Sequence, residues 1–334
     1  MQQCNRPMNT KKYLYVGGGT AGHVYPAQAL AQTRPNYNHF LLTDQRGVKF
    51  AQFFGMQCAV SPFNRKGVFW SFFPAFFHAF KFFKQHKFDA VFVFGGYVTV
   101  VPAIVAWLKR IKIYVIETNA IEGRAVKFIK RFAYANFSSF EMKGFEQVGF
   151  LARQEFTPCS DNKHTKQHTI LIMGSSIGTD FFCSILPLVF KHLSFKPHII
   201  HHAPISKHQQ LQKDYEHFTY EIKEFFPNIC DQMQQADLII SRAGASTVAE
   251  IIALNKRAIL VPYKLAANNH QLANAQALSK YPNFYYLEED AFASADFGHS
   301  LARIIEHQLA ASLCEVTILA NGANAIWGKL ENHA

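Results

Sequence analysis

One stretch of the chain, residues 237–275, constrains the fold most strongly, because strand, turn and helix follow one another there without a spacer. Asp237 to Ser241 is a short apolar run, typical of a strand buried in a parallel sheet. Residues 242–246 (RAGAS) are too small and polar to continue that strand, and helical spacing then runs from Thr247 to Leu254. Ala258 to Val261 reads as a second buried strand. The stretch therefore predicts an α/β unit with parallel strands.

The turn in this stretch lies at the carboxyl end of a strand and at the amino end of a helix. Ligands bind at that place in open α/β sheets, and the N–H groups that begin a helix attract phosphate. Glu250 lies one turn inside the helix, where it can accept hydrogen bonds from sugar hydroxyls. A structural turn with Glu250 as a solvated charge is the alternative, and this stretch alone supports both equally.

A second strand, small-residue loop and helix occur near the start of the chain. Strand Tyr13 to Val16 leads into GGGTAGH (17–23), and a helix follows from about Val24 to Gln32. The loop is not a Walker loop, and its glycine spacing is wrong for a dinucleotide fingerprint, for which Asp44 is the only candidate ribose acid. His23 stands at the lip of the loop. A lone histidine is more often structural, but this position favours chemistry.

The same unit recurs through both halves of the chain. Strand Ala90 to Phe94 ends in Gly95-Gly96-Tyr97, and a new sheet begins with Thr169 to Met173 before GSSIGT (174–179). Residues 154–167 are polar and form a plausible linker. We therefore predict two doubly wound, Rossmann-like α/β domains that face each other across a cleft.

A phenylalanine-rich segment covers residues 68–87, and its phenylalanines follow the spacing of a single helical face. A core-facing helix is the usual explanation of such a stripe. However, this segment has almost no Leu, Ile or Val, and lysines border it, as in helices that lie on anionic membranes. Part of the face must still pack on the sheet.

The composition limits the class of protein. With 334 residues, 49% apolar and 17% charged, the chain is long enough for two folded domains. No apolar run approaches the ~20 residues that span a bilayer, and no signal-peptide core precedes the first strand, so we expect a cytoplasmic protein. The net charge of +11 favours an anionic partner. Six scattered cysteines and the absence of a D-x-D pair predict no metal site.

Six segments carry a family resemblance, in order along nearly the whole chain. They are GGGTAGHVYPAQALA (17–31), FGGYVTVVPAIVAWL (94–108), ETNAIEGRAVKFI (117–129), VGFLAR (148–153), GSSIGT (174–179), and SRAGASTVAEIIALNKRAILVP (241–262) with HQLANA (270–275). Together they resemble the MurG family, the UDP-N-acetylglucosamine transferases that make lipid II in peptidoglycan synthesis.

The resemblance implies a GT-B fold and an inverting transfer that needs no metal or other cofactor. N-acetylglucosamine would pass from UDP-GlcNAc to the 4-hydroxyl of the muramoyl sugar of lipid I, which is linked to undecaprenyl diphosphate. Residues 1–152 would form the lipid-acceptor domain, with a C-terminal helix at about 318–334 packing back on it. Residues 153–317 would form the UDP-GlcNAc-binding domain.

The resemblance also implies roles for single residues. His23 would be the general base, Glu250 would bind the ribose, Gln271 the sugar hydroxyls, and Phe226 would mark the backbone that reads uracil. The turn expected at the donor diphosphate consists of Ala245, Ser246, Thr247, Val248 and Ala249. Other residues expected around the donor are Ser176 and Arg153 near the phosphates, and Thr20, Ala21, Gly22 and Asn119 near the transferred sugar.

The phenylalanine-rich helix matches the region with which the family docks on membranes. The residues expected to dock are Phe69, Trp70, Phe72, Phe73, Phe76, Phe77, Phe80, Lys81 and Lys84. The resemblance thus implies a peripheral protein on the cytoplasmic face of the cell membrane, acting in cell-wall biogenesis, cell shape and cell division, with other cell-wall synthesis proteins as candidate partners.

The chain departs from the family pattern at three places. Ile116 replaces a histidine before Glu117, GSSIGT replaces GGSQGA, and Ala21 replaces a glycine. Three alternatives follow: a GT-B transferase acting on another lipid such as diacylglycerol, an inactive homologue serving as a scaffold, and a nucleic-acid-binding module. The last rests only on the net charge, and we expect no nucleic-acid partner.

Overall fold

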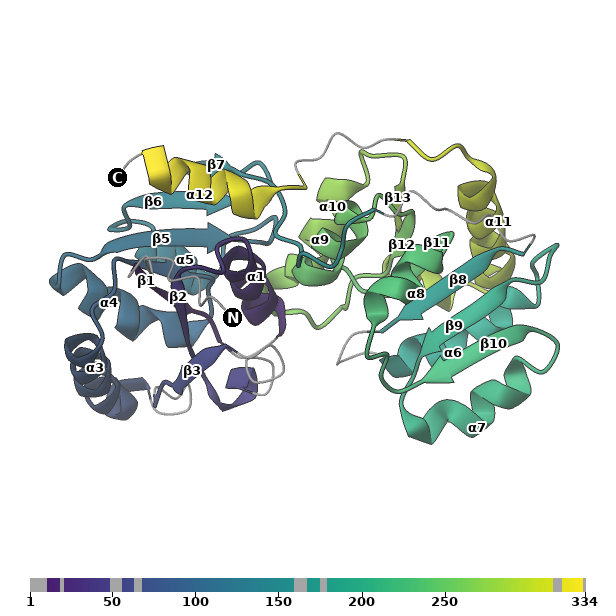
Figure 1. Cartoon of the computed structure of the whole chain (residues 1–334). Helices are drawn as coiled ribbons and strands as arrows, with labels where there is room; N and C mark the ends of the chain where they lie inside the picture. Colours follow the sequence, from purple (N-terminus) through teal and green to yellow (C-terminus); the bar gives the residue numbers. More distant parts are fainter. Residues whose placement is uncertain are drawn as a thin grey trace, which may run out of the picture. The chain divides into compact units, whose positions relative to one another are not determined.

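The computed structural model describes residues 11–18, 21–48, 56–62, 68–158, 167–174, 179–314 and 320–332. Its internal contacts divide the chain into two compact units (Figure 1). The first unit contains Met1–Gln154 and Leu319–Ala334, and the second contains Glu155–Ile318. Because the C-terminal segment belongs to the first unit, the chain crosses between the units twice.

A parallel sheet with the order β3-β2-β1-β4-β5-β6-β7 forms the centre of the first unit. Its strands are β1 (Lys12–Val16), β2 (Asn38–Thr43), β3 (Gln57–Val60), β4 (Ala90–Val93), β5 (Lys112–Glu117), β6 (Ala135–Ser138) and β7 (Glu146–Gln147). The chain builds outward from β1 to β3, returns to β4 and then builds in the opposite direction. The reversal lies between β1 and β4, where ligands bind in such sheets.

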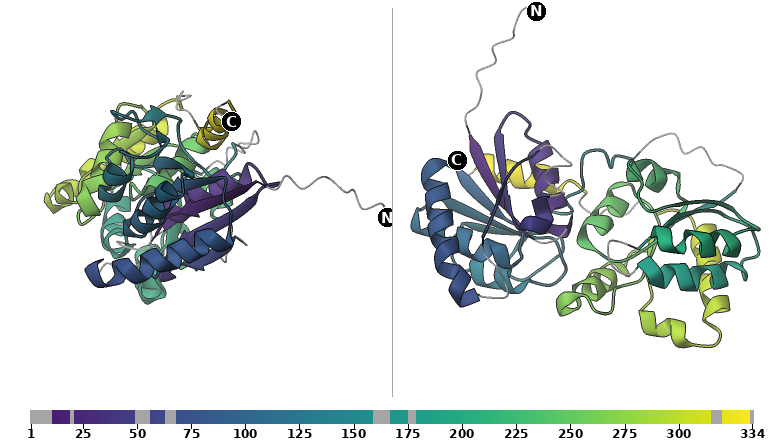
Figure 2. Two further views of the ribbon diagram at one scale, coloured as in Figure 1. Left: turned by 90° about the vertical axis from the view of Figure 1, so that its left-hand side faces the viewer. Right: turned by 90° about the horizontal axis from the view of Figure 1, so that it is seen from below.

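Helices cover both faces of this sheet (Figure 2). They are α1 (Ala21–Gln32), α3 (Val68–Gln85), η2 (Tyr97–Thr99), α4 (Val100–Leu108), α5 (Arg124–Ile129) and α12 (Gly322–Asn332). The alternation of side chains along β1 separates the two layers: Leu14 and Val16 pack toward α3, α4 and α5, whereas Tyr13 and Tyr15 pack toward α1 and α12. Both faces are therefore dry, as expected of a parallel sheet.

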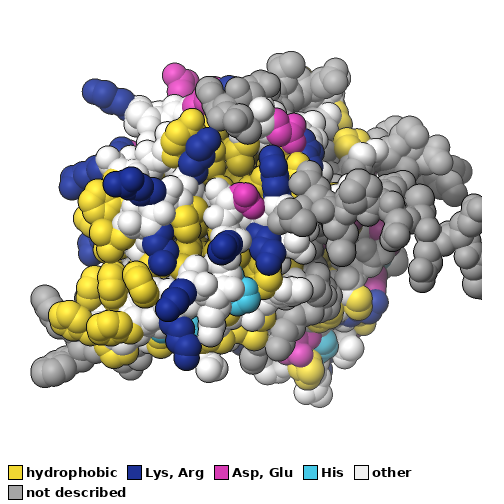
Figure 3. Space-filling view, turned by 60° about the vertical axis from the view of Figure 1, so that its left-hand side comes forward, with side chains coloured by type: hydrophobic (Ala, Val, Ile, Leu, Met, Phe, Trp, Pro, Cys, Tyr) yellow, Lys and Arg dark blue, Asp and Glu magenta, His cyan; other side chains and the backbone are white. Residues whose placement is uncertain are grey.

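The phenylalanines of α3 do not share one face, so the sequence-based prediction of a single stripe was wrong. Phe83 is buried with Ala75 and Ala79, while Phe72 and Phe76 are half-buried against the same core. The neighbouring face carries Phe73 and Phe77, which are 67% and 68% exposed, and Phe80 at 43%. The helix therefore has an inner aromatic face that packs and an outer one that meets solvent (Figure 3).

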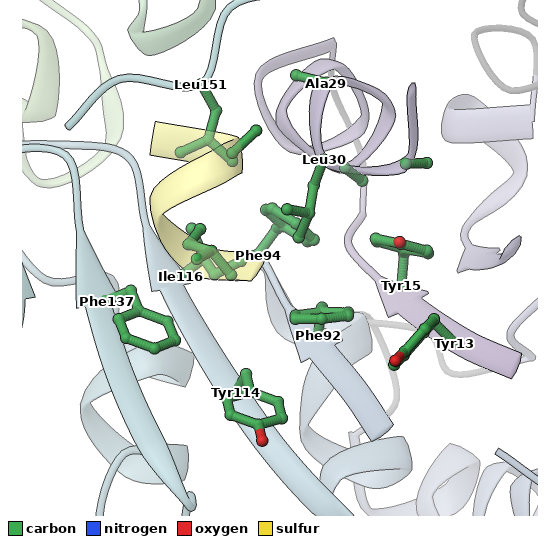
Figure 4. Close-up of a cluster of buried hydrophobic side chains, with 14 of the residues drawn as sticks. Tyr13, Tyr15, Ala29, Leu30, Phe92, Phe94, Tyr114, Ile116, Phe137 and Leu151 are labelled. Carbon is green, nitrogen blue, oxygen red and sulfur yellow. The ribbon is translucent and has the colours of Figure 1, made fainter. Parts of the chain in front are cut away.

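Aromatic rings fill the opposite side of the sheet (Figure 4). The ring centroids of Tyr15 and Phe92 lie 5.3 Å apart, and those of Phe92 and Tyr114 lie 5.5 Å apart. Trp327 of α12 meets Phe92 edge-on at 5.4 Å, and its indole Nε1 donates to the carbonyl of Leu30 in α1 at 3.0 Å. The buried indole, with its N–H satisfied, anchors α12 against α1 and the sheet.

The second unit repeats the design with the parallel order β10-β9-β8-β11-β12-β13. Its strands are β8 (Thr169–Met173), β9 (His198–His202), β10 (Thr219–Lys223), β11 (Leu238–Ser241), β12 (Ala258–Leu260) and β13 (Phe284–Tyr286). Its helices are α6 (Thr179–Phe190), α7 (Ile205–Asp214), α8 (Ile229–Gln235), α9 (Ala245–Ala253), η3 (Ala267–Asn269), α10 (His270–Leu278), η4 (Glu289–Ala293) and α11 (Phe297–Ala310). Here the strand order reverses between β8 and β11, and the prediction of two doubly wound α/β sheets is confirmed.

A fully buried histidine lies in the core of this second sheet. His201 Nδ1 lies 3.0 Å from the hydroxyl of Tyr215, and its Nε2 lies 3.8 Å from Cys183 Sγ. Burial, with a smaller contribution from His202 and His208, lowers the pKa of His201 to about 3. The folded protein therefore holds this imidazole neutral at pH values where an unfolded chain would protonate it.

We expect His201 to make the second unit sensitive to acid. Because the pKa is lowered on folding, the stabilisation is complete above pH 6.5, the ordinary value, and is lost as the pH falls toward 3. In His201→Gln nothing titrates at this position, so the advantage of the unmodified protein in unfolding free energy should shrink by about 2 kcal/mol between pH 7 and pH 5. Urea unfolding at both values measures this.

His217→Gln is the control, because the side chain of His217 is 77% exposed. Its difference from the unmodified protein should not change with pH. A difference for His201→Gln that is the same at pH 7 and pH 5 would show that His201 takes up its proton equally in both states.

Candidate active site

In the second unit, a ligand-binding turn joins β11 to α9. The helix begins at Ala245, two residues earlier than the sequence predicts, and its first backbone bond runs from Val248 N to Gly244 O at 2.9 Å. The N–H groups of Ala245, Ser246 and Thr247 therefore precede the hydrogen-bond ladder and point out of the helix start. A Cβ placed on Gly244 would meet nothing within 4 Å, so the turn borders open space. Val248 and Ala249 are buried in the next turn.

Arg242 fixes this turn from beneath. Its guanidinium is buried and donates to the carbonyl of Val261 at 3.1 Å and to Glu289 Oε1 at 2.5 Å. Three aromatic rings enclose it within 5.5 Å, those of Phe181, Phe182 and Tyr263. Burial lowers the pKa of Arg242, and Glu289 opposes that effect. The ion pair and the aromatic enclosure together hold the end of β11 against the end of β12.

A second tie comes from α10. Asn274 is fully buried, and its Nδ2 donates to the carbonyl of Ala243 at 3.0 Å. Gln271 lies three residues earlier on the same helical face, and its Oε1 accepts the N–H of Tyr263 at 2.9 Å. The start of α10 is thus set against the turn, with the amide group of Gln271 oriented by the backbone. Sequence analysis singled out Gln271 but missed Asn274 and Arg242, because their partners are distant in sequence.

Two other predicted donor residues of this unit have definite places. Glu250 is buried within α9, next to the turn. Phe226 is buried just after β10, at the same edge of the sheet as the turn, and Lys223 Nζ lies 5.5 Å from its ring centroid. Ser176 lies outside the described residues.

In the first unit, His23 occupies the opening turn of α1. Its Nδ1 lies 2.5 Å from the carbonyl oxygen of Gly18. A carbonyl only accepts, so Nδ1 is assigned the proton, and Nε2 takes the acceptor role in the neutral ring. A Cβ placed on Gly95 would lie 3.6 Å from Nε2, and one placed on Gly96 would lie 3.6 Å from Cε1. The basic nitrogen of His23 therefore faces the loop that follows β4.

Glycine is required at two points of this contact. Gly95 and Gly96 have φ of +91° and +84°, which strain any residue with a Cβ. A Cβ on Gly18 would approach Val98 Cγ2 to 2.3 Å, so only glycine lets the two loops pack this closely. Gly22 is half-buried in the same turn as His23, whereas Thr20 and the side chain of Ala21 lie outside the described part.

A buried carboxylate organises the loop after β5. Glu117 ends that strand, and its Oε1 accepts from both the N–H and the Nδ2 of Asn119 at 3.0 Å, while its Oε2 accepts from Gly123 N at 2.9 Å. Burial raises the pKa of Glu117, and these hydrogen bonds limit the rise. Asn119, a predicted sugar contact, is therefore oriented by Glu117, which sequence analysis did not single out.

Arg153 lies in the first unit rather than beside the turn of α9. It is buried, and its guanidinium carbon lies 4.6 Å from the ring centroid of Tyr25 in α1. This places Arg153 on the same helix as His23. Its predicted contact with donor phosphates stays a prediction.

An aromatic-basic surface covers the outside of α3 and continues beyond it. We define it by exposed Phe73, Phe77, Phe80, Trp107, Leu108 and Phe128 with Lys81, Lys84 and Lys109. Lys109 Nζ lies 4.2 Å from the ring centroid of Phe80, which joins α3 to the end of α4. The ring of Phe132 then lies between Trp107, at 5.8 Å, and Phe128, at 5.5 Å. Sequence analysis missed the contributions of α4 and α5; the side chains of Phe69 and Trp70 are not described.

Two searches of the described residues returned nothing. No helix within the described ranges combines the length and apolar character that crossing a bilayer requires. Likewise, three or more His, Cys, Asp or Glu side chains that could hold a metal ion do not gather anywhere in the described part of the chain.

Comparison with known proteins gives matches in both units. Residues 13–138 match the glycosyltransferase family 28 N-terminal domain, and residues 169–313 match the glycosyltransferase family 28 C-terminal domain. The chain is 29% identical over 329 residues to a protein of Rickettsia felis named UDP-N-acetylglucosamine–N-acetylmuramyl-(pentapeptide) pyrophosphoryl-undecaprenol N-acetylglucosamine transferase, covering 89% of this chain and 91% of the relative. A Rickettsia canadensis protein of the same name is 29% identical over 323 residues, with the same coverage.

Solved structures show the same relationship. The crystal structure of Acinetobacter baumannii MurG aligns with a TM-score of 0.78 and 25% identity, covering 96% of this chain and 99% of that one. The calicheamicin glycosyltransferase CalG4 aligns with a TM-score of 0.64 at 11% identity, over 97% of this chain and 95% of that one, which shows a shared fold alone. The fold is thus of the GT-B type. The chain belongs to glycosyltransferase family 28, as a member of its MurG family.

Proposed function

We propose that this protein transfers N-acetylglucosamine from UDP-GlcNAc to the 4-hydroxyl of the muramoyl sugar of lipid I, giving lipid II for peptidoglycan synthesis. The observation that carries the proposal is the match, over 89% of the chain, to transferases named for this reaction. The match includes both of the sheet edges at which the candidate residues lie.

The second unit supplies the donor side of the proposed reaction. The N–H groups of Ala245, Ser246 and Thr247 receive the diphosphate, and the positive end of α9 opposes the charge that develops on the departing UDP. Glu250 accepts from the ribose, Gln271 contacts the sugar hydroxyls, and the backbone beside Phe226 reads the uracil. The chain has no D-x-D pair, and we assign this charge stabilisation to the helix start, with no metal required.

The first unit supplies the acceptor side. The 4-hydroxyl of lipid I attacks the anomeric carbon of N-acetylglucosamine from the face opposite UDP, so one C–O bond forms as the other breaks and the configuration inverts. His23 Nε2 takes the hydroxyl proton, while the Gly18 carbonyl holds Nδ1 and fixes the tautomer. Asn119, oriented by Glu117, contacts the transferred sugar.

A transfer assay tests the reaction. Purified protein with radiolabelled UDP-GlcNAc should glycosylate lipid I and leave diacylglycerol unlabelled, and a chelator of divalent cations should not change the rate. Transfer to diacylglycerol alone would establish a different lipid acceptor. No transfer to either lipid, with UDP still bound, would indicate an inactive homologue.

His23→Ala should lower turnover roughly 10²- to 10⁴-fold, the usual contribution of a general base. Its affinity for UDP should be nearly unchanged, because His23 belongs to the other unit. Initial rates on lipid I and titration with UDP measure the two effects. The exposed His217→Ala is the matched control; turnover of the His23 variant equal to that of the control would exclude His23 as the base.

We also propose that the aromatic-basic surface docks on an anionic membrane, where lipid I resides. Exposed rings can enter the headgroup region, while lysines beside them are attracted to anionic lipids. The fold does not need the outer rings, since Phe73 and Phe77 are mostly exposed. The protein would accordingly act as a peripheral protein of the inner face of the membrane.

Phe73→Glu combined with Phe77→Glu should strongly weaken sedimentation with phosphatidylglycerol vesicles, because two charges replace the rings expected to insert. The melting temperature should change little. Phe225→Glu with Leu265→Glu, two exposed positions of the second unit, is the matched control. Equal vesicle binding by both double variants, or preferential binding of the unmodified protein to oligonucleotides, would contradict membrane docking by this surface.

A further inference from the structure

A buried carboxylate holds an exposed guanidinium at the carboxyl edge of the first unit's sheet. Asp44 follows β2 directly and is buried. Its Oδ1 accepts the backbone N–H groups of Arg46 and Gly47 at 2.9 and 3.1 Å, in the manner of a helix cap. Its Oδ2 accepts from Arg46 Nη2 at 2.8 Å and Nε at 3.3 Å. The side chain of Arg46 nevertheless remains 62% exposed.

This pair belongs to the same edge as His23. The strand order places β1 between β2 and β4, so the loop after β1 lies between Asp44 and the loop after β4. The hydroxyl of Tyr97 crosses that interval and donates to Asp44 Oδ2 at 3.3 Å. Tyr97 directly follows Gly96, whose added Cβ would lie 3.6 Å from the His23 ring. Contacts therefore connect Arg46 with His23 through Asp44 and Tyr97.

The geometry makes Arg46 a prepared anion receptor. Nε and Nη2 bind Asp44, which fixes the plane of the guanidinium before any ligand arrives and reduces the entropy lost on binding. Burial acts to raise the pKa of Asp44, but the hydrogen bonds from Arg46 and Gly47 prevail, and the pKa lies below its ordinary value. Asp44 is therefore ionised near neutral pH and holds Arg46 in one orientation. A planar, permanently charged fork suits phosphate oxygens.

Building on the proposed function, we propose that Arg46 binds the diphosphate of the polyprenyl-linked acceptor, with Asp44 as its positioning residue. In such an acceptor the diphosphate is attached to the anomeric carbon, across the sugar ring from the 4-hydroxyl. A diphosphate on Arg46 therefore directs the other side of the ring along the sheet edge toward His23. Arg46 serves binding and orientation and takes no part in the proton transfer.

Isothermal titration with farnesyl diphosphate, which has a diphosphate but neither sugar nor peptide, tests the assignment without turnover. Arg46→Gln should bind it at least about tenfold more weakly than the unmodified protein. Arg46→Lys should recover part of the affinity, and Asp44→Asn should weaken binding because the fork loses its support. Arg303→Gln, at an exposed arginine of the second unit, is the control. Equal affinity in Arg46→Gln, or no binding by the unmodified protein, overturns the proposal.

Two further titrations separate the possible sources of phosphate. UDP should bind Arg46→Gln as tightly as the unmodified protein, and phosphatidylglycerol vesicles should too. A variant that loses affinity for UDP or for vesicles but keeps it for farnesyl diphosphate would assign Arg46 to the donor or to lipid headgroups, and would overturn the proposal.

Kinetics separate this proposal from the proposed function. In transfer to lipid I, Arg46→Gln should raise the KM for the acceptor while leaving the KM for UDP-GlcNAc unchanged. An unchanged acceptor KM overturns the role of Arg46 alone. If the unmodified protein transfers nothing to lipid I while farnesyl diphosphate binding still depends on Arg46, the proposed function fails and the anion site stands.

Discussion

The reversal of strand order in each parallel sheet is the constraint on which both candidate sites depend. Between β1 and β4, and again between β8 and β11, neighbouring loops leave the sheet edge in opposite directions. Backbone and side chains can then meet a ligand at the carboxyl edge without breaking the ladder below. In the first unit this edge holds His23, Arg46 and Asn119, and in the second it holds the start of α9.

Much of the fold could be predicted because its central strands are short apolar runs that end in small residues. Such runs identify β1, β4, β8 and β11 in the sequence. Two-residue β7 and the brief β6 and β13 have no pattern of their own and exist through pairing with their neighbours. The start of α9 was misplaced because Ala245 and Ser246 suit a turn as well as a first helical turn. On α3, spacing alone did not separate Phe76 from Phe77, although the sheet covers the first and not the second.

The candidate site divides in the same way. His23, Gln271 and the turn before α9 stand in local motifs, so the sequence could nominate them, and their roles stay predictions. The groups that orient them act over long separations: Asn274 reaches Ala243, and Arg242 reaches Glu289. No local pattern reveals such pairs. Glu117 also escaped notice, since a glutamate at a strand end looks like a surface charge until burial and its hydrogen bonds are seen.

The contact between His23 and Gly18 has a consequence for how this sequence can drift. Many catalytic histidines are oriented by a carboxylate, which one substitution removes. Here the orienting oxygen belongs to the peptide backbone, so no exchange of side chain can delete it. Replacement of Gly18 itself is blocked sterically by Val98. The chain can therefore carry Ile116 and Ala21 in place of the residues usual in its family while the imidazole keeps the same tautomer.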